Sequence, residues 1–325
     1  MFSPVIIVGG GPAGSSCAWA LRRRGIDSLI LDKARFPRTK LCAGWITPEV
    51  VADLEMDIGA YPHRFLTFEV TRVHLYGLRL NMRAPQHSIR RFEFDHWLLE
   101  RSGAQVLNHE ARRIERRDGR FVIDDRFECE YLVGAGGTAC PVYRGLFREV
   151  NPRARTLQAV ALEQELPCEW RDGDCHLWFF HKGLPGYSWY VPKADGYLNL
   201  GVGAMAARLK DRGDDIRPHW DRFETRLRGR GLIDGGLELA PQGYAYYLRD
   251  GVQRLCLDKA FVIGDAAGLA TRDMAEGIGP AVRSGLLAAE AIAGEADYTL
   301  ETIAAHSLPA GLPRHILEYK LLGRS

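Results

Sequence analysis

The sequence lacks several features that would assign a protein quickly to a class. Its 325 residues contain no H-E-x-x-H zinc motif, no G-x-S-x-G nucleophile turn and no Walker loop. The seven cysteines form no C-x-x-C pair and have no close histidine partners, which argues against a disulfide framework and against a structural zinc site. We therefore expect no metal centre, and a reducing compartment such as the cytoplasm.

An excess of charge of one sign is also missing, because 43 basic residues oppose 41 acidic ones and leave a net charge of +2. This balance provides no global field for nucleic acid, so we expect a small-molecule substrate and no nucleic-acid partner. No apolar run has membrane-spanning length, and no signal peptide precedes the first predicted strand. We expect a cytoplasmic protein, monomeric or weakly dimeric, with peripheral membrane contact as an open alternative.

The clearest positive signal lies close to the N-terminus. The apolar, β-branched run 5–8 is followed by the turn Gly9–Gly14, which fits the pattern G-x-G-x-x-G and opens a helix. Glycines at these positions permit a tight turn, close approach of phosphates, and packing of the helix on the strand. A second apolar strand, 28–31, ends in Asp32, whose carboxylate can bind ribose hydroxyls. The spacing predicts a dinucleotide site.

The rest of the chain alternates between two kinds of pattern. Residues 65–82 and the aromatic block 156–203 have the two-residue period of antiparallel strands, whereas 131–144 and 260–268 are again strands with Gly-rich turns. Between them we predict a helix from His96 to Ser102 and, among other strands, one over 110–117. The predicted fold class is α/β, with a Rossmann-type domain interleaved with a mostly antiparallel substrate domain. The predicted boundaries are 1–64, 93–150 and 251–295 for the first domain, 65–92 and 151–250 for the second, and 296–325 for a short tail.

Three segments are candidates for chemistry, and each has a plainer alternative. Residues 33–45 form a loop with four cations, which could hold phosphates and bring Cys42 beside a redox centre, or be a solvated loop with an incidental thiol. Tyr187, Trp189 and Val191 share one face of a strand, as a substrate wall or as ordinary core. The tail can cap the core or touch a lipid surface, and capping is the preferred interpretation.

These motifs, in this order, resemble the one-Rossmann-domain FAD oxidoreductases of the p-hydroxybenzoate hydroxylase fold. Within that superfamily, Lys40-Leu41-Cys42-Ala43-Gly44, Arg91-x-x-Phe94-Asp95, Tyr187-x-Trp189-x-Val191-Pro192 and Gly264-Asp265-Ala266-Ala267-Gly268 are most similar to the geranylgeranyl reductase family. The chain departs from that family in four ways. Val191 replaces a phenylalanine, Ala43 replaces a frequent glycine, Gly136 replaces the aspartate of an Ala-Asp-Gly turn, and the chain is shorter.

The resemblance implies an FAD-dependent enzyme that transfers hydride from reduced flavin to a C=C bond of an apolar, isoprenoid-like substrate. It implies Cys42, Tyr187 and Trp189 as catalytic residues, with NAD(P)H or another external donor reducing the flavin. The implied FAD-binding residues are Gly9, Gly11, Pro12, Ala13, Gly14, Asp32, Lys33, Lys40, Cys42, Ala43, Arg91, Gly136, Gly264, Asp265, Gly277, Ile278 and Gly279. A monooxygenase or halogenase of the same fold, and a flavin-binding protein without turnover, remain alternatives.

Overall fold

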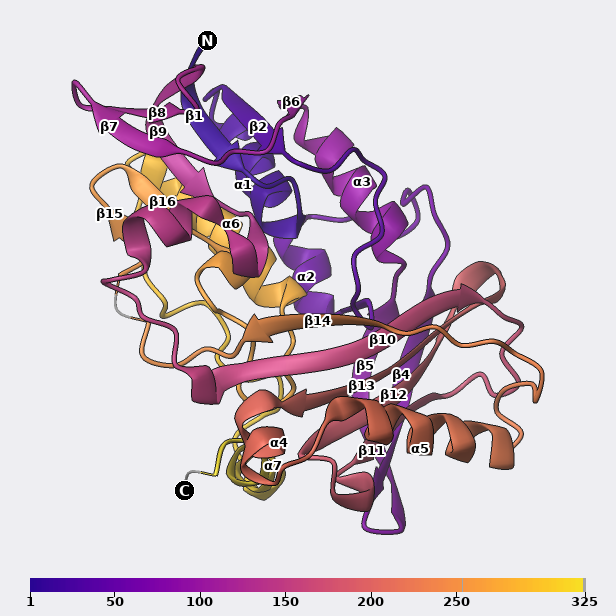
Figure 1. Ribbon diagram of the computed structural model, residues 1–325. Coiled ribbons are helices and arrows are strands. Elements are labelled where there is room, and N and C mark those ends of the chain that lie inside the picture. The colour runs from indigo at the N-terminus through magenta and orange to yellow at the C-terminus, as the bar shows by residue number, and fades with distance from the viewer. Residues whose placement is uncertain (253, 324–325) are drawn as a thin grey trace.

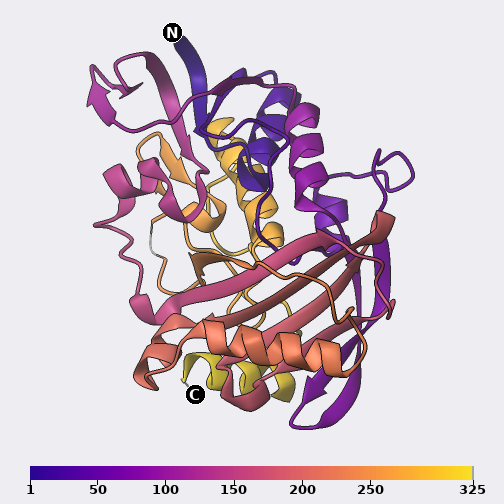
Figure 2. The same ribbon diagram turned by 45° about the vertical axis from the view of Figure 1, so that its right-hand side comes forward.

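The computed structural model describes residues 1–252 and 254–323 and contains two large β-sheets, each with its own helices (Figures 1 and 2). The first sheet has the order β15-β16-β9-β1-β2-β6, and the hairpin β7–β8 pairs with β9. Its central strands are parallel, and the side chains of Val5, Ile6 and Ile7 in β1 are fully buried. The strands are β1 (Phe2–Val8), β2 (Ser28–Asp32), β6 (Gln105–Asn108), β7 (Ile114–Arg117), β8 (Arg120–Ile123), β9 (Phe127–Gly134), β15 (Cys256–Leu257) and β16 (Ala260–Val262).

Four helices accompany this sheet. They are α1 (Pro12–Arg23), α2 (Pro48–Asp53), α3 (Arg91–Ser102) and α6 (Ile278–Ile292). Helix α1 packs between α3 and α6, and apolar side chains from all of them share one core with β1. This arrangement places the N-termini of α1 and α6 at the carboxyl edge of the parallel strands, where α/β sheets bind ligands.

Two predicted boundaries in this region are wrong. Helix α3 begins at Arg91 rather than His96, because Arg91 and Asp95 are one turn apart and pair across the first turn of the helix. Strand β7 begins at Ile114 rather than at 110, because the Asp124 carboxylate accepts hydrogen bonds from the N–H groups of Arg112 and Arg113. Those two residues therefore form a turn with Asp124 instead of a strand.

The second sheet has the order β14-β10-β13-β12-β11-β4-β5-β3 and is antiparallel except where β11 runs parallel to β4. Its strands are β3 (Trp45–Ile46), β4 (Leu66–Leu75), β5 (Leu78–Ser88), β10 (Gln158–Pro167), β11 (Cys175–Phe179), β12 (Gly186–Lys193), β13 (Tyr197–Met205) and β14 (Gln242–Tyr247). The short strand β3 thus belongs to this sheet, although it lies within the segment 1–64 that we assigned to the first domain. The α/β fold class, with its interleaved antiparallel sheet, is confirmed.

The two faces of the second sheet have different neighbours. Helix α5 (Ile216–Gly229) crosses one face of the sheet (Figure 1). There Phe223 packs on Trp178, and Trp220 packs on Phe223 within the same apolar cluster. On the opposite face, Tyr187 and Trp189 join a cluster that includes Met274, from the segment that follows the first sheet. The predicted stripe of aromatic residues is therefore real, and it faces the region where the two halves of the molecule meet.

The C-terminal segment forms a helix that packs on the second sheet. Helix α7 (Leu312–Leu322) buries Leu317 and Leu321, and Leu321 contacts a cluster that includes Met205 of β13. The short helix α4 (Ala206–Asp211) follows β13 directly. Capping of the core by the tail is thus observed. Among the described residues, no helix is both long and apolar enough to cross a membrane.

Candidate active site

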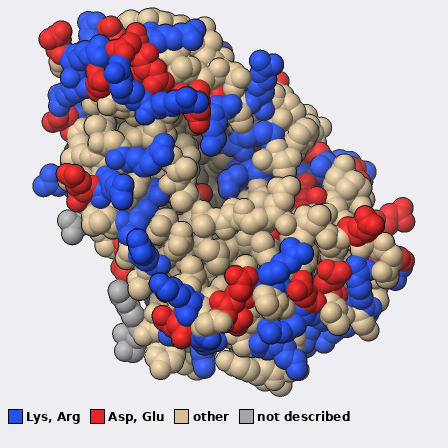
Figure 3. All heavy atoms as spheres, viewed as in Figure 1, with Lys and Arg blue, Asp and Glu red and all other residues tan. Residues whose placement is uncertain are grey.

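A large cleft opens at the carboxyl edge of the first sheet. Its volume is about 670 Å³, and basic side chains gather around the hollow that Figure 3 shows between the two parts of the molecule. Many residues predicted to bind the cofactor line it, namely Gly9, Gly11, Pro12, Ala13, Asp32, Lys33, Lys40, Cys42, Arg91, Gly136, Asp265, Gly277 and Ile278. The sequence prediction therefore identified residues that the fold gathers around one cavity.

The turn after β1 can be built only from residues without side chains at key positions. Gly9 has a φ of 113°, and a Cβ added there would lie 2.4 Å from the carbonyl oxygen of Ala135. A Cβ at Gly14 would lie 1.9 Å from the carbonyl oxygen of Gly9. Gly14 does not line the cleft, and neither does Gly264, whose N–H donates to the Ser284 hydroxyl. These two glycines act through packing rather than by facing the cavity.

Helix N-termini provide hydrogen-bond donors to the cleft. Gly11 caps α1 and Gly277 caps α6, and no side chain accepts a hydrogen bond at either cap. The first-turn N–H groups of these helices are therefore available to anionic groups such as a pyrophosphate. The Asp265 carboxylate lies beside Gly277, since a Cβ there would be 3.2 Å from its Oδ1.

The Asp32 carboxylate is fixed at the end of β2. It accepts hydrogen bonds from the N–H of Gly10 at 2.7 Å and from the N–H of Ala34 at 2.8 Å. Both bonds come from the backbone of neighbouring turns, so the carboxylate is held in one orientation at the cleft wall. Its oxygens retain lone pairs that can accept ribose hydroxyls.

Two arginines, Arg38 of the loop 33–45 and Arg91 of α3, share one aspartate. Arg91 forms a two-pronged bond to buried Asp95, with N···O distances of 2.6 and 2.7 Å, and Arg38 lies 3.3 Å from the same carboxylate. Burial lowers the pKa of Arg38, whereas Asp95 opposes that shift. Arg38 also lines the cleft, although we did not single it out from the sequence. Nothing in its local pattern separates it from the other cations of that loop.

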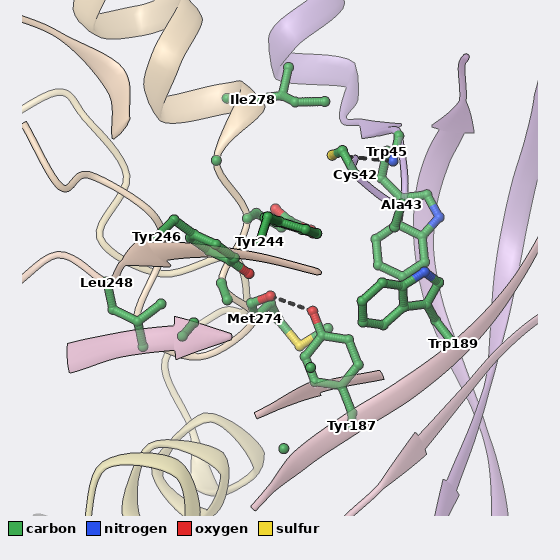
Figure 4. Close-up of a pocket in the computed structure, with 18 of the residues that line it drawn as sticks. Cys42, Ala43, Trp45, Tyr187, Trp189, Tyr244, Tyr246, Leu248, Met274 and Ile278 are labelled. Atoms are coloured by element: carbon green, nitrogen blue, oxygen red, sulfur yellow. Dashed lines mark hydrogen bonds between the residues drawn. The ribbon is translucent and has the colours of Figure 1, made fainter. Parts of the chain in front are cut away.

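A second, smaller pocket of about 80 Å³ adjoins the cleft (Figure 4). Its wall includes Tyr187 and Trp189 of the second sheet together with Ala43 and Gly279. The Tyr187 hydroxyl donates a hydrogen bond of 2.6 Å to the carbonyl of Met274. Residues that line both cavities form their common wall, and these are Cys42, Tyr244, Tyr246, Ala275, Gly277 and Ile278.

A buried carboxyl group anchors the loop that carries Cys42. Glu163 of β10 is 1% exposed, and its Oε1 accepts from the Cys42 N–H at 2.5 Å and from Asn199 at 3.0 Å. Its Oε2 accepts from the Tyr244 hydroxyl at 3.1 Å. Burial raises the pKa of Glu163, although these hydrogen bonds oppose the shift. Asn199 in turn accepts from the indole N–H of Trp189 at 2.7 Å.

Lys193 fixes the same loop from the other side. Its ammonium group is fully buried and donates to the carbonyls of Ala43 at 2.5 Å, Ile89 at 2.8 Å and Gly44 at 3.3 Å. Burial lowers the pKa of Lys193, while nearby carboxylates oppose the change. One weak signal for this network is present in the sequence: Ala159, Ala161 and Glu163 alternate on one face of β10, which places a carboxyl group in a row of small buried residues.

The chain resembles known proteins over most of its length. Residues 7–72 match the NAD(P)-binding Rossmann-like domain. The chain is 31% identical to an uncharacterised protein of Methanosarcina barkeri, over 89% of this chain and 74% of that protein. It is 29% identical to the menaquinone reductase of Mycobacterium tuberculosis, over 88% and 75%, and 26% identical to the geranylgeranyl diphosphate reductase of Rhodobacter capsulatus, over 88% and 73%.

Solved structures show the same fold. A geranylgeranyl bacteriochlorophyll reductase-like protein of Thermoplasma acidophilum superposes with a TM-score of 0.73 at 18% identity, covering 90% of this chain and 78% of that one. The flavin-dependent halogenase CmlS superposes with a TM-score of 0.69 at 20% identity, covering 90% and 58%. At these identities the likeness concerns the fold alone.

Proposed function

Because the chain belongs to the geranylgeranyl reductase and menaquinone reductase family of FAD-dependent oxidoreductases, we propose that it reduces a C=C bond of an apolar, isoprenoid-like substrate. FAD supplies the hydride when it is bound and reduced. Its adenosine and pyrophosphate would lie against Asp32, Gly9 and Gly11 in the larger cleft. The cleft suits phosphates, since Gly11, at the N-terminus of α1 where no side chain caps the helix, lines it.

One observation carries this proposal: the smaller pocket shares a wall with the cofactor cleft. Cys42, Ala275 and Gly277 line both cavities. A substrate held against Tyr187 and Trp189 would therefore adjoin a flavin ring at the end of α6. Aromatic side chains provide a broad apolar contact area for a prenyl chain and exclude water from the reacting bond.

The residues of this chain bind and orient the reactants. Glu163 and Lys193 hold the loop 40–44 between the two cavities, and Asn199 holds the Trp189 indole. Cys42 stands at the junction, with its sulfur accepting a 3.4 Å hydrogen bond from the N–H of Gly44. We assign Cys42, Tyr187 and Trp189 to substrate and flavin positioning, and we propose NAD(P)H or another external donor as reductant.

Mass spectrometry of anaerobic reactions tests the proposal. The flavoprotein would be reduced without oxygen and incubated separately with menaquinone and with geranylgeranyl diphosphate, which are the substrate classes named by two relatives. A product heavier by two hydrogens supports the proposal, and its identity selects the substrate. A product that gains an oxygen or a halogen only after air is admitted would instead indicate monooxygenase or halogenase chemistry. A flavin that no donor reduces would indicate a binding protein.

A further inference from the structure

Reduction of a C=C bond requires a proton as well as a hydride, and the smaller pocket contains a group suited to supply it. Among the described residues that line this pocket, Glu276 carries the single carboxyl group. It lies in the segment between β16 and α6, directly before Gly277, which belongs to the wall common to both cavities. Glu276 therefore stands where the substrate pocket and the cofactor cleft meet.

The backbone around Glu276 is held firmly. Its N–H donates to the Thr271 hydroxyl at 3.0 Å, and its carbonyl accepts from the Thr271 N–H at 2.9 Å. The preceding residue, Ala275, has a left-handed φ of 56°, which is rare for a residue with a side chain. Strained backbone of this kind persists where the surrounding structure over-determines it, and it is frequent at functional sites.

The surroundings of the carboxyl group favour its protonated form. Burial, together with the carboxylates of Asp273 and of Glu49 on α2, raises the pKa of Glu276 to about 7, while a hydrogen bond with Ser307 opposes the shift. The Tyr187 phenol of β12 lines the same pocket and is close enough to interact electrostatically with Glu276. Within the described part of the chain Glu276 has no ion-pair partner. In neutral solution a carboxyl group with such a pKa is protonated in a large fraction of the molecules and can readily release that proton.

The other proton-bearing groups of the pocket are committed elsewhere. The Tyr187 hydroxyl donates to the carbonyl of Met274, and the Tyr244 hydroxyl donates to Glu163. Burial raises the pKa of Tyr187, Tyr244 and Tyr246 above the usual tyrosine value, so these phenols hold their protons tightly. The Cys42 sulfur accepts the Gly44 N–H and lies beside the Arg91 guanidinium.

We propose that the Glu276 carboxyl group is the proton donor of the reduction, an inference that rests on the proposed function. The hydride and its electron pair form a C–H bond at one alkene carbon while the π bond breaks. The other carbon takes the proton from the Glu276 oxygen. The reduced flavin is oxidised, the substrate gains two hydrogens, and the Glu276 carboxylate regains a proton from solvent. Cys42 is left with a positioning role.

Substitution of the carboxyl group tests this assignment. Glu276→Gln keeps the size and can keep the hydrogen bond with Ser307, so FAD content and flavin reduction should match the wild type. Turnover should fall by about a hundredfold or more, which is the usual contribution of a general acid. Glu276→Asp should keep part of the activity. The matched control is Glu290→Gln, the same change near the far end of α6, which should leave turnover unchanged.

The pH dependence adds a second readout. Because the acid form donates the proton, wild-type turnover should be full below the pKa of Glu276 and fall as pH rises through about 7. Glu276→Gln should lack this limb, and Cys42→Ala should retain it. Equal turnover and an unchanged limb in Glu276→Gln would overturn the proposal.

Infrared spectroscopy of the resting protein separates this proposal from the proposed function. The wild type and Glu290→Gln should show a protonated-carboxyl band that disappears as pH rises through about 7, and Glu276→Gln should lack it. If the band is present but neither menaquinone nor geranylgeranyl diphosphate is reduced, the proposed function fails while the protonated carboxyl stands. If product forms and no such band exists, the assignment of Glu276 fails alone.

Discussion

The two cavities are built in contrasting ways. At one end of the cofactor cleft the wall is formed by the Gly-rich turns after β1 and β9, which are short stretches with their own sequence patterns. The smaller pocket, which we propose for the substrate, is lined mainly by residues of β12, β13, β14, the loop 42–47 and the segment before α6, and its largest side chains include Tyr187, Tyr246 and Met274. A wall made from Gly-rich turns is encoded locally, whereas a pocket made from side chains depends on how distant segments meet.

The largest expected effect breaks the Gly-rich wall of the cofactor cleft. Gly9→Ala places a methyl group against the carbonyl of Ala135 at a φ of 113°, so we expect a loss of about 3 kcal/mol or more in folding free energy and loss of FAD. Gly25→Ala is the matched control, because Gly25 also has a positive φ, of 71°, but no atoms lie within 4 Å of its added Cβ. It should cost about 1 kcal/mol and retain FAD. Denaturation curves measure the folding free energy of the two variants, and the yellow absorbance of the purified proteins measures their FAD content. Equal losses of folding free energy in Gly9→Ala and Gly25→Ala would refute the collision with Ala135 as the cause.

A Gly→Ala substitution that disturbs the smaller pocket should affect substrate binding rather than FAD binding. A Cβ at Gly201 of β13 would lie 2.0 Å from the Trp189 ring, so Gly201→Ala must displace the indole. We expect a cost of about 1–3 kcal/mol from overpacking, a raised KM for substrate and normal FAD content. Gly203→Ala is gentler, since its Cβ would lie 3.3 Å from the ring. Loss of FAD in Gly201→Ala would show that the two cavities are not separable.

Cys42 lies on the wall common to both cavities, so its substitution tests what a residue at this wall contributes to turnover. Cys42→Ala removes the sulfur but keeps the backbone N–H bonded to Glu163. We expect turnover to fall by about tenfold, equal to ~1.4 kcal/mol in the activation barrier, with the pH limb intact. Steady-state turnover rates of Cys42→Ala and the wild type, measured across a range of pH, test both expectations. A much larger loss with a vanished limb would make Cys42, rather than Glu276, the proton donor.

The smallest expected effect is a change in how steeply the free energy of unfolding depends on pH. Because burial raises the pKa of Glu163 above its unfolded value, the folded protein resists ionisation, and stability should decline as pH rises above the ordinary glutamate pKa. Glu163→Gln should flatten this decline, measured as unfolding free energy against pH. The pKa of Glu276 is raised too, so Glu276→Gln should also reduce the decline of unfolding free energy with rising pH. The two variants are best measured in parallel. An unchanged slope in both variants would contradict the assigned burial effects.

The contrast explains what could be predicted from the sequence. Gly9, Asp32 and Gly277 stand in continuous motifs, so their meeting at one cleft was predictable once a Rossmann fold was recognised. Glu163 and Cys42 are far apart in the chain, and a glutamate in an alternating strand is typical of a solvated face. Only the folded structure, in which the loop that carries Cys42 donates to the Glu163 carboxylate, reveals that this face is covered.

The common wall has a practical consequence for assays. Since Cys42, Tyr246 and Gly277 line both cavities, a ligand entering the smaller pocket would change the polarity beside a flavin ring bound at the end of the cleft. Flavin absorbance and fluorescence respond to such changes. The bound cofactor would thereby act as an intrinsic optical probe, and libraries of candidate substrates could be screened by titration without turnover or labels.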